Sequence, residues 1–187
     1  MIAAVQNLDF SIVNTLSTYT VTHTWASVLV YVCAEMLIAV PFLTLALMWF
    51  QPGRFTTYRP IRKAVVMTIM ALTVALALKS LIAFLISRDR PFISHPDMLY
   101  LPFKVDSSSF PSGHTILAFT MAFSLLWSKF QRTGTTFLLI ACIVAFARVA
   151  AGVHYPTDIL GGIVVAFIAT WFVFREASGV REYLPNK

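Results

Sequence analysis

Charged residues are scarce in this sequence, and long polar stretches are almost absent. Only 12% of its 187 residues are Asp, Glu, Lys or Arg, whereas 58% are hydrophobic. Soluble domains usually carry about 25% charged residues, so this composition excludes an ordinary soluble domain and indicates an integral membrane protein. The length fits one domain. We therefore expect residues 1–187 to form a single integral-membrane domain.

Cysteine is scarce as well, with two residues, and the acidic residues do not cluster. Cys33 and Cys142 lie inside apolar runs, so we expect buried free thiols and no disulfide framework. The first Lys or Arg is Arg54, so the charged start of a secretory signal peptide is missing. The eight acidic residues are dispersed without the spacing of metal ligands. We therefore expect no essential metal and no cofactor.

Apolar stretches long enough, or nearly so, to cross a bilayer as helices of about 20 residues fill most of the chain. These five stretches lie near 25–50, 64–86, 112–130, 135–152 and 156–174. Residues 1–24 carry Val5, Leu8, Ile12 and Leu16 at spacings of three and four, which predicts an amphipathic helix in the membrane interface. A frayed terminus is the alternative. The sequence thus predicts an all-α, polytopic transmembrane bundle of about five spanning helices with an N-terminal interfacial helix.

Basic residues are divided unequally between the two sides of these predicted helices. Nine lie on one side, namely Arg54, Arg59, Arg62, Lys63, Lys129, Arg132, Arg175, Arg181 and Lys187. The other side has Arg88, Arg90 and Lys104. The positive-inside rule then makes 175–187 a cytoplasmic tail and 87–111 an outer-face loop, which we expect to form a lid or rim. Orientation in the bilayer also explains the net charge of +6, so we expect no nucleic-acid partner.

Three polar segments interrupt the apolar pattern, all on the predicted outer side. They are Arg90-Pro91, then Pro111-Ser112-Gly113-His114, then Arg148 followed by His154-Tyr155-Pro156-Thr157-Asp158. Polar groups near membrane depth are costly and usually functional. Both arginines offer planar forks suited to phosphate oxygens. We therefore expect the three segments to form one site for a phosphate-sized anion.

Two of these segments also carry signals for the start of a helix. The Ser112 hydroxyl is placed to cap a helix, and Gly113 would let an anion approach the free amide groups there. Pro156 suits the first turn of the last apolar stretch, which puts Asp158 in the same turn. Two helix starts would then flank one pocket.

The segments resemble the three motifs of the type 2 phosphatidic acid phosphatase (PAP2) family, which read Lys-x6-Arg-Pro, Pro-Ser-Gly-His and Ser-Arg-x5-His-x3-Asp. The resemblance covers roughly residues 60–175. It implies a metal-independent membrane phosphatase in which His154 is the nucleophile, Asp158 orients it, and His114 protonates the leaving group and later activates water. Spacing alone would permit the reverse roles for the two histidines. The phosphate-binding residues that it implies are Arg90, Ser112, Gly113 and Arg148.

The sequence departs from the family pattern at two positions. Ala147 stands in place of the serine, and Ala83 stands in place of the lysine. Lys79 lies one helical turn before Ala83, so its flexible chain could still reach the phosphate. Arg88 is the competing substitute. Glu35, inside the first apolar stretch, is either a buried hydrogen-bonded acid or part of a lipid-facing groove.

The resemblance also suggests a substrate. A compact chain with an outward-facing site is similar to the bacterial enzymes that recycle undecaprenyl pyrophosphate, which implies a lipid pyrophosphate or phosphate substrate at the outer face of the plasma (inner) membrane. Phosphatidylglycerophosphate and phosphatidate are the alternatives. A vanadate-dependent haloperoxidase would use a similar anion pocket, but those relatives are soluble. A non-catalytic protein that binds or transports a phosphorylated lipid would keep the arginines without needing the histidine and aspartate. The sequence makes no prediction of oligomeric state.

Overall fold

The computed structural model describes residues 2–50, 55–103 and 108–182, and these residues are helical with short connections and no strand. The helices are α1 (Ile2–Thr22), α2 (Thr24–Tyr31), the π-helical turn η1 (Val32–Met36), α3 (Ala39–Phe50), α4 (Phe55–Leu85), α5 (Pro91–Ser94), α6 (Gly113–Trp127), α7 (Gln131–Ala150) and α8 (Pro156–Glu182). The all-α prediction is therefore confirmed.

Helices that match the five predicted apolar stretches form the body of the molecule. Among the residues that the structure describes, four segments are long and apolar enough to cross a bilayer: Thr24–Phe50, Arg59–Leu85, Gln131–Ala150 and Pro156–Ala177. The fifth, α6, has 15 residues, which corresponds to about 22 Å of helix. It is shorter than the predicted 112–130 because Ser112 is its N-cap and it ends before Ser128.

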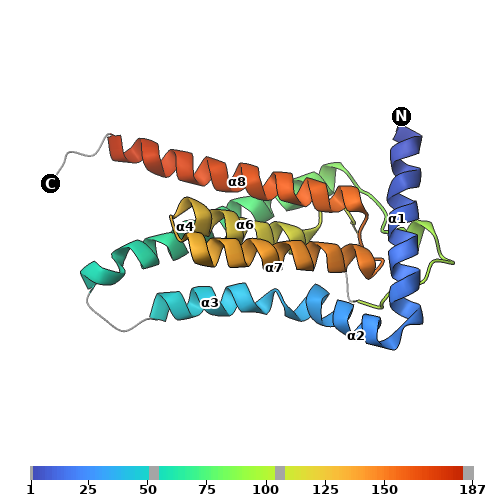
Figure 1. The fold of residues 1–187 in the computed structure, drawn as a ribbon. Helices are drawn as coiled ribbons and strands as arrows, with labels where there is room; N and C mark the ends of the chain where they lie inside the picture. Colours follow the sequence, from blue (N-terminus) through green and yellow to red (C-terminus); the bar gives the residue numbers. More distant parts are fainter. Residues whose placement is uncertain (1, 51–54, 104–107, 183–187) are drawn as a thin grey trace.

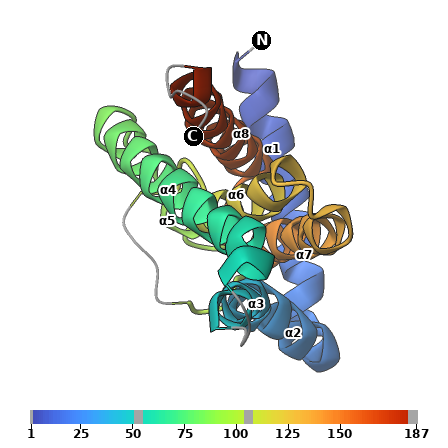
Figure 2. The ribbon, with the colours of Figure 1, turned by 90° about the vertical axis from the view of Figure 1, so that its left-hand side faces the viewer.

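The short helix α6 lies in the centre of the bundle. It packs against α4, α7 and α8, which surround it in the view along the bundle (Figure 2). Most of its side chains are buried, including Ile116, Met121 and Leu125, which have no exposed surface. A helix that is apolar on all sides and enclosed by three others is fixed by packing. The start of α6 is therefore held in place at one end of the bundle.

Helix α1 lies across that same end, nearly perpendicular to the other long helices (Figure 1). Its inner face, including Asp9 and Val13, is buried, whereas Val5, Leu8 and Ile12 on its predicted apolar face are exposed. The alternative of a frayed terminus is therefore wrong. An exposed apolar face on a helix set across the bundle suits a membrane interface, but the interfacial position itself stays a prediction.

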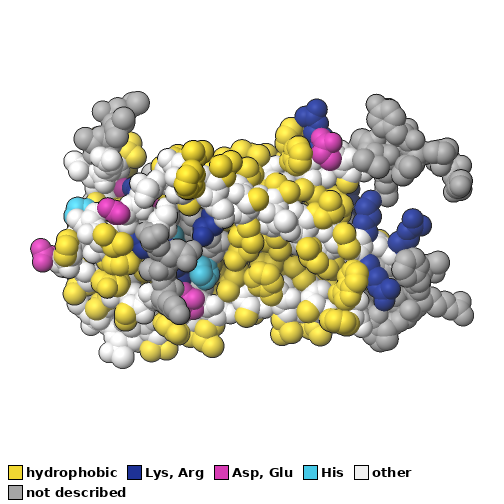
Figure 3. Space-filling model, turned by 180° about the vertical axis from the view of Figure 1, so that it is seen from behind, with side chains coloured by type: hydrophobic (Ala, Val, Ile, Leu, Met, Phe, Trp, Pro, Cys, Tyr) yellow, Lys and Arg dark blue, Asp and Glu magenta, His cyan; other side chains and the backbone are white. Residues whose placement is uncertain are grey.

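Charge is segregated along the bundle, as expected for a membrane protein. The space-filling view shows Lys and Arg at the end opposite α1, an apolar belt between, and mixed acidic, basic and histidine side chains near α1 (Figure 3). Four of the basic residues used to predict orientation, Arg54, Lys104, Lys187 and the side chain of Arg181, lie outside the described part of the chain.

Candidate active site

The three polar segments meet at the end of the bundle that α1 covers. The amide of Ser112 donates to the carbonyl of Asp158 over 3.2 Å, which joins the start of α6 to the first turn of α8. Arg90 Nη1 donates to the carbonyl of Val153 over 2.9 Å and lies 3.3 Å from His154 Nε2. Residues separated by up to 64 positions in sequence are thus neighbours around one point.

His154 and Asp158 lie one helical turn apart and face each other. His154 Nδ1 is 3.5 Å from Asp158 Oδ2, at the outer limit of a hydrogen bond. His154 lies in the connection between α7 and α8, where burial, reinforced by the positive charges of Arg90 and Arg148, lowers its pKa to about 4. The ring is therefore neutral near pH 7. With its proton on Nδ1 toward the carboxylate, Nε2 carries the electron pair, which accepts from Arg90 Nη1 in this structure.

The Asp158 carboxylate is itself held from several sides. Its Oδ2 accepts the hydroxyl of Ser109 over 2.5 Å and the amide of Tyr155 over 2.8 Å. Its Oδ1 lies 2.7 Å from Arg88 Nη1. Asp158 has no exposed surface, so this carboxylate is desolvated and its position is fixed by these donors.

Arg88 is engaged behind Asp158. Its Nη2 lies 2.9 Å from Asp9 Oδ2 of α1, and its guanidinium lies 4.0 Å above the Tyr155 ring. Asp9 also accepts the amide of Thr157 over 3.1 Å and the Thr157 hydroxyl. Through these contacts Arg88 links α1 to α8. Because its guanidinium is already paired with two carboxylates, the geometry does not favour it as the substitute for the family's lysine.

Lys79 reaches the start of α6. A methyl group added at Gly113 would lie 3.4 Å from Lys79 Cε and 3.7 Å from Nζ, so the lysine side chain lies directly against the Pro-Ser-Gly-His segment. Lys79 therefore extends to the site, although it lies one helical turn before Ala83. Between the two candidates left open by the sequence, the geometry favours Lys79.

Ser112 holds the predicted position but makes a different hydrogen bond. It is the N-cap of α6 and has no exposed surface, yet its side chain makes no hydrogen bond to the amides of the helix. Its oxygen instead accepts the Thr115 hydroxyl over 3.1 Å. The prediction that this hydroxyl caps α6 is therefore wrong. The first amides of a helix lack partners within the helix, so those of α6 remain suited to an anion.

Arg148 lies on the opposite side of the site and is paired with Glu35. Its side chain is only 2% exposed, and Nη1 lies 2.5 Å from Glu35 Oε1. Glu35 Oε2 is 3.6 Å from His114 Nε2. Glu35 is hydrogen-bonded, as in the first of the two roles left open for it, but its side chain is 30% exposed and therefore not buried as that role required. Sequence reasoning did not place it in this site, because it lies far from the three motifs.

Comparison with known proteins assigns the family. The PAP2 superfamily model matches residues 62–180. This chain belongs to that superfamily. It is 34% identical to the bacitracin transport permease protein BcrC of Bacillus licheniformis over 79% of this chain and 70% of that protein. It is 31% identical to the undecaprenyl-diphosphatase BcrC of Bacillus subtilis over 58% of this chain and 55% of that one.

Solved structures of this superfamily share the fold. LpxE of Aquifex aeolicus matches with a TM-score of 0.68 and 22% identity, over 90% of this chain and 95% of that one. Together with the family match and the spanning helices, these relatives identify the chain as a membrane lipid phosphatase of the PAP2 type. The expected bundle and the expected class of enzyme are confirmed.

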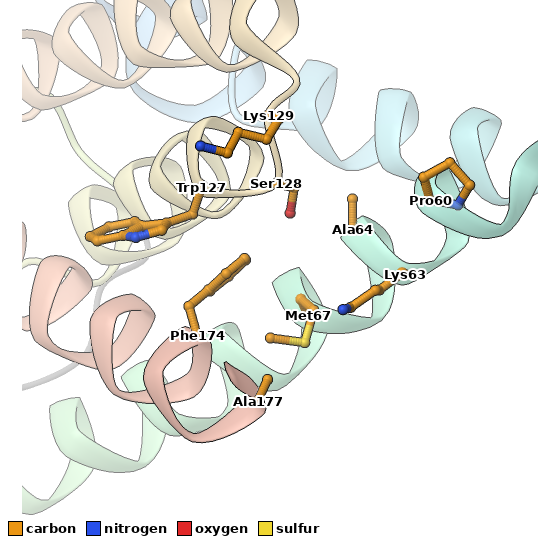
Figure 4. A pocket seen from close by; sticks show the side chains of 9 residues that line it. All are labelled: Pro60, Lys63, Ala64, Met67, Trp127, Ser128, Lys129, Phe174 and Ala177. Carbon is orange, nitrogen blue, oxygen red and sulfur yellow. The ribbon is translucent and has the colours of Figure 1, made fainter. Parts of the chain in front are cut away.

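Other polar features lie away from the PAP2 motifs. His23 stacks on Tyr19 with ring centres 4.3 Å apart, and His95 stacks on Phe10 at 3.7 Å. A pocket of about 280 Å³ opens at the opposite end of the bundle, and its lining combines Lys63 and Lys129 with apolar side chains (Figure 4). Within the described residues, no three His, Cys, Asp or Glu side chains are grouped to hold a metal. Metal independence remains a prediction.

Proposed function

We propose that this phosphatase hydrolyses undecaprenyl diphosphate to undecaprenyl phosphate and inorganic phosphate. The observation that carries the proposal is the position of His154, between Asp158 and Arg90 at the meeting point of the three motifs. The relative from B. subtilis named for this reaction supports the choice of substrate. A prenyl tail in the bilayer would help to position the diphosphate, since remote binding energy can be used at the reacting centre.

The reaction would proceed in two steps through a phosphohistidine. His154 Nε2 attacks the terminal phosphorus, and the bond to the bridging oxygen breaks while His114 donates a proton to the leaving lipid phosphate. Arg90, Arg148 and Lys79 would stabilise the charge on the transferred group, together with the first amides of α6. Water deprotonated by His114 then attacks the phosphohistidine, which releases inorganic phosphate and restores His154.

A substrate panel tests this proposal. Purified protein in detergent should release phosphate from undecaprenyl diphosphate with a higher kcat/KM than from phosphatidylglycerophosphate or phosphatidate. His95→Ala is a matched control, because this outer-end histidine stacks on Phe10 outside the motifs, and it should retain activity. Faster hydrolysis of a glycerophospholipid would reject the prenyl substrate. Tight lipid binding with no phosphate release would favour the non-catalytic alternative.

We further propose that the site faces the outside of the plasma membrane. Support comes from the basic residues at the end opposite the site, which the positive-inside rule assigns to the cytoplasm (Figure 3). A cysteine introduced at Asp97, in the exposed connection after α5, should react with an impermeant thiol reagent in intact cells. A cysteine at Arg59, near the start of α4, should not. The opposite pattern would put the site in the cytoplasm.

A further inference from the structure

The Glu35 carboxylate bridges two groups that the proposed reaction needs. One oxygen lies 2.5 Å from Arg148 Nη1, and the other lies 3.6 Å from His114 Nε2. In the proposed reaction Arg148 binds a phosphoryl oxygen and His114 serves the leaving oxygen. A carboxylate between them therefore occupies space next to His114 and a hydrogen-bond donor of Arg148 that a bound phosphate would use.

Arg148 needs an anion when no substrate is bound. Its side chain is 2% exposed, and a buried charge is costly unless it is paired. The Phe103 ring lies 5.3 Å from its guanidinium carbon on another side and offers only a weaker cation-π contact. Glu35 supplies a negative charge next to Arg148 in this structure.

Unlike the carboxylate of Asp158, that of Glu35 lies where it can move away. Its side chain is 30% exposed, against 0% for Asp158. It belongs to the π-helical turn η1, an irregular element frequent at functional sites. The spanning segment that contains η1, Thr24–Phe50, is also the least buried. In its apolar 18-residue window 17% of the residues are buried, against 33% to 50% in the other three candidate spanning helices of the described chain.

We infer that Glu35 competes with phosphate for Arg148 and His114, and that it is displaced when substrate binds. This inference rests on the proposed function. Two negative groups cannot share these donors without repulsion, so displacement lowers the affinity of the site for every anion. A lipid substrate offsets that cost through binding of its tail, whereas inorganic phosphate has no tail. Glu35 thus sets the specificity for lipid-linked over free phosphate and limits inhibition by the product.

Replacing Glu35 by Gln tests the inference, because an amide keeps a hydrogen-bond acceptor for Arg148 and loses the charge. The inhibition constants of inorganic phosphate and vanadate should fall by roughly 10-fold, which corresponds to about 1.4 kcal/mol. Glu35→Asp, which withdraws the carboxylate by one methylene, should lower them less. Asp97→Asn is the control, since it removes the same charge from an exposed position outside the site, and it should leave both constants unchanged.

Two outcomes separate this inference from the proposed function. If Glu35→Gln leaves phosphate inhibition unchanged or weaker, the inference is wrong even when the wild-type protein hydrolyses its lipid. A lower kcat with an unchanged inhibition constant would show instead that Glu35 positions His114. If the wild type hydrolyses no lipid phosphate, the proposed function fails. Calorimetric titration of phosphate into wild type and Glu35→Gln would then still decide whether Glu35 competes.

Discussion

Two carboxylates on opposite sides of the site differ in how firmly they are held. Asp158 is fully buried and receives a hydroxyl, an amide and a guanidinium within 2.5 to 2.8 Å. Glu35 is partly exposed and contacts Arg148 and His114. The difference separates two tasks. The side behind His154 is fixed before substrate arrives, as preorganised catalysis requires, and the side that binds the phosphate is able to rearrange.

Removal of the proposed nucleophile should have the largest effect. His154→Ala deletes the imidazole that lies between Asp158 and Arg90, so turnover and any trapped phosphoenzyme should disappear. A phosphate-release assay with ³²P-labelled substrate and an acid-quench gel would measure both. The helical fold should persist by circular dichroism. If more than a small fraction of activity survives, His154 is not the nucleophile.

Replacing Lys79 tests the side of the site that is proposed to bind phosphate. Lys79→Ala should lower kcat/KM by about 10 to 100-fold, or roughly 1.4 to 2.7 kcal/mol of charge stabilisation. The loss should be smaller than that of Arg148→Ala, because a flexible ammonium gives one contact where arginine gives a rigid fork. Steady-state kinetics on the three proteins would rank them.

A double variant provides the control for this prediction. Lys79→Ala combined with Ala83→Lys moves the ammonium up one helical turn, to the position of the family's lysine. Activity should be restored if the lysine contacts substrate directly. If Lys79→Ala is as active as wild type, the lysine is structural and Arg88 again becomes the candidate for the missing charge.

Replacing Asp9 tests the side of the site that holds Asp158, at a distance from the substrate. Asp9→Asn can keep the contact with the Thr157 amide through its oxygen, but its NH₂ group would face Arg88 Nη2, now 2.9 Å from Asp9 Oδ2. Arg88 would lose this charge partner, and Asp158 would be held less firmly. We expect kcat to fall about 10-fold, with KM little changed, because the effect on the substrate is indirect. A rise in KM alone would show that Asp9 acts on substrate binding instead.

The same comparison explains how much the sequence could predict. Ser112, Arg148, His154 and Asp158 were predicted because the second and third motifs keep their spacing, whereas Arg90 was predicted from the Arg-Pro pair that remains of the first. The spanning helices were found because apolar runs have a characteristic length. Asp9 and Glu35 were not assigned to the site. Asp9 lay on the polar side of a predicted amphipathic helix, and Glu35 was one acid inside an apolar run. Their roles depend on how α1 and η1 pack against the end of the bundle, which no local pattern specifies.

Removing divalent metal ions should have the smallest effect. On both sides of the site the charges that oppose an anion come from side chains, with Arg90, Arg148 and Lys79 around the phosphate and Arg88 behind Asp158. Phosphoryl transfer needs positive charge around the transferred group, and arginine supplies it at any working pH. Activity should therefore persist in excess EDTA, and vanadate, which mimics the five-coordinate transition state, should inhibit. Loss of activity in chelator with recovery on adding Mg²⁺ would mean that these cations are insufficient.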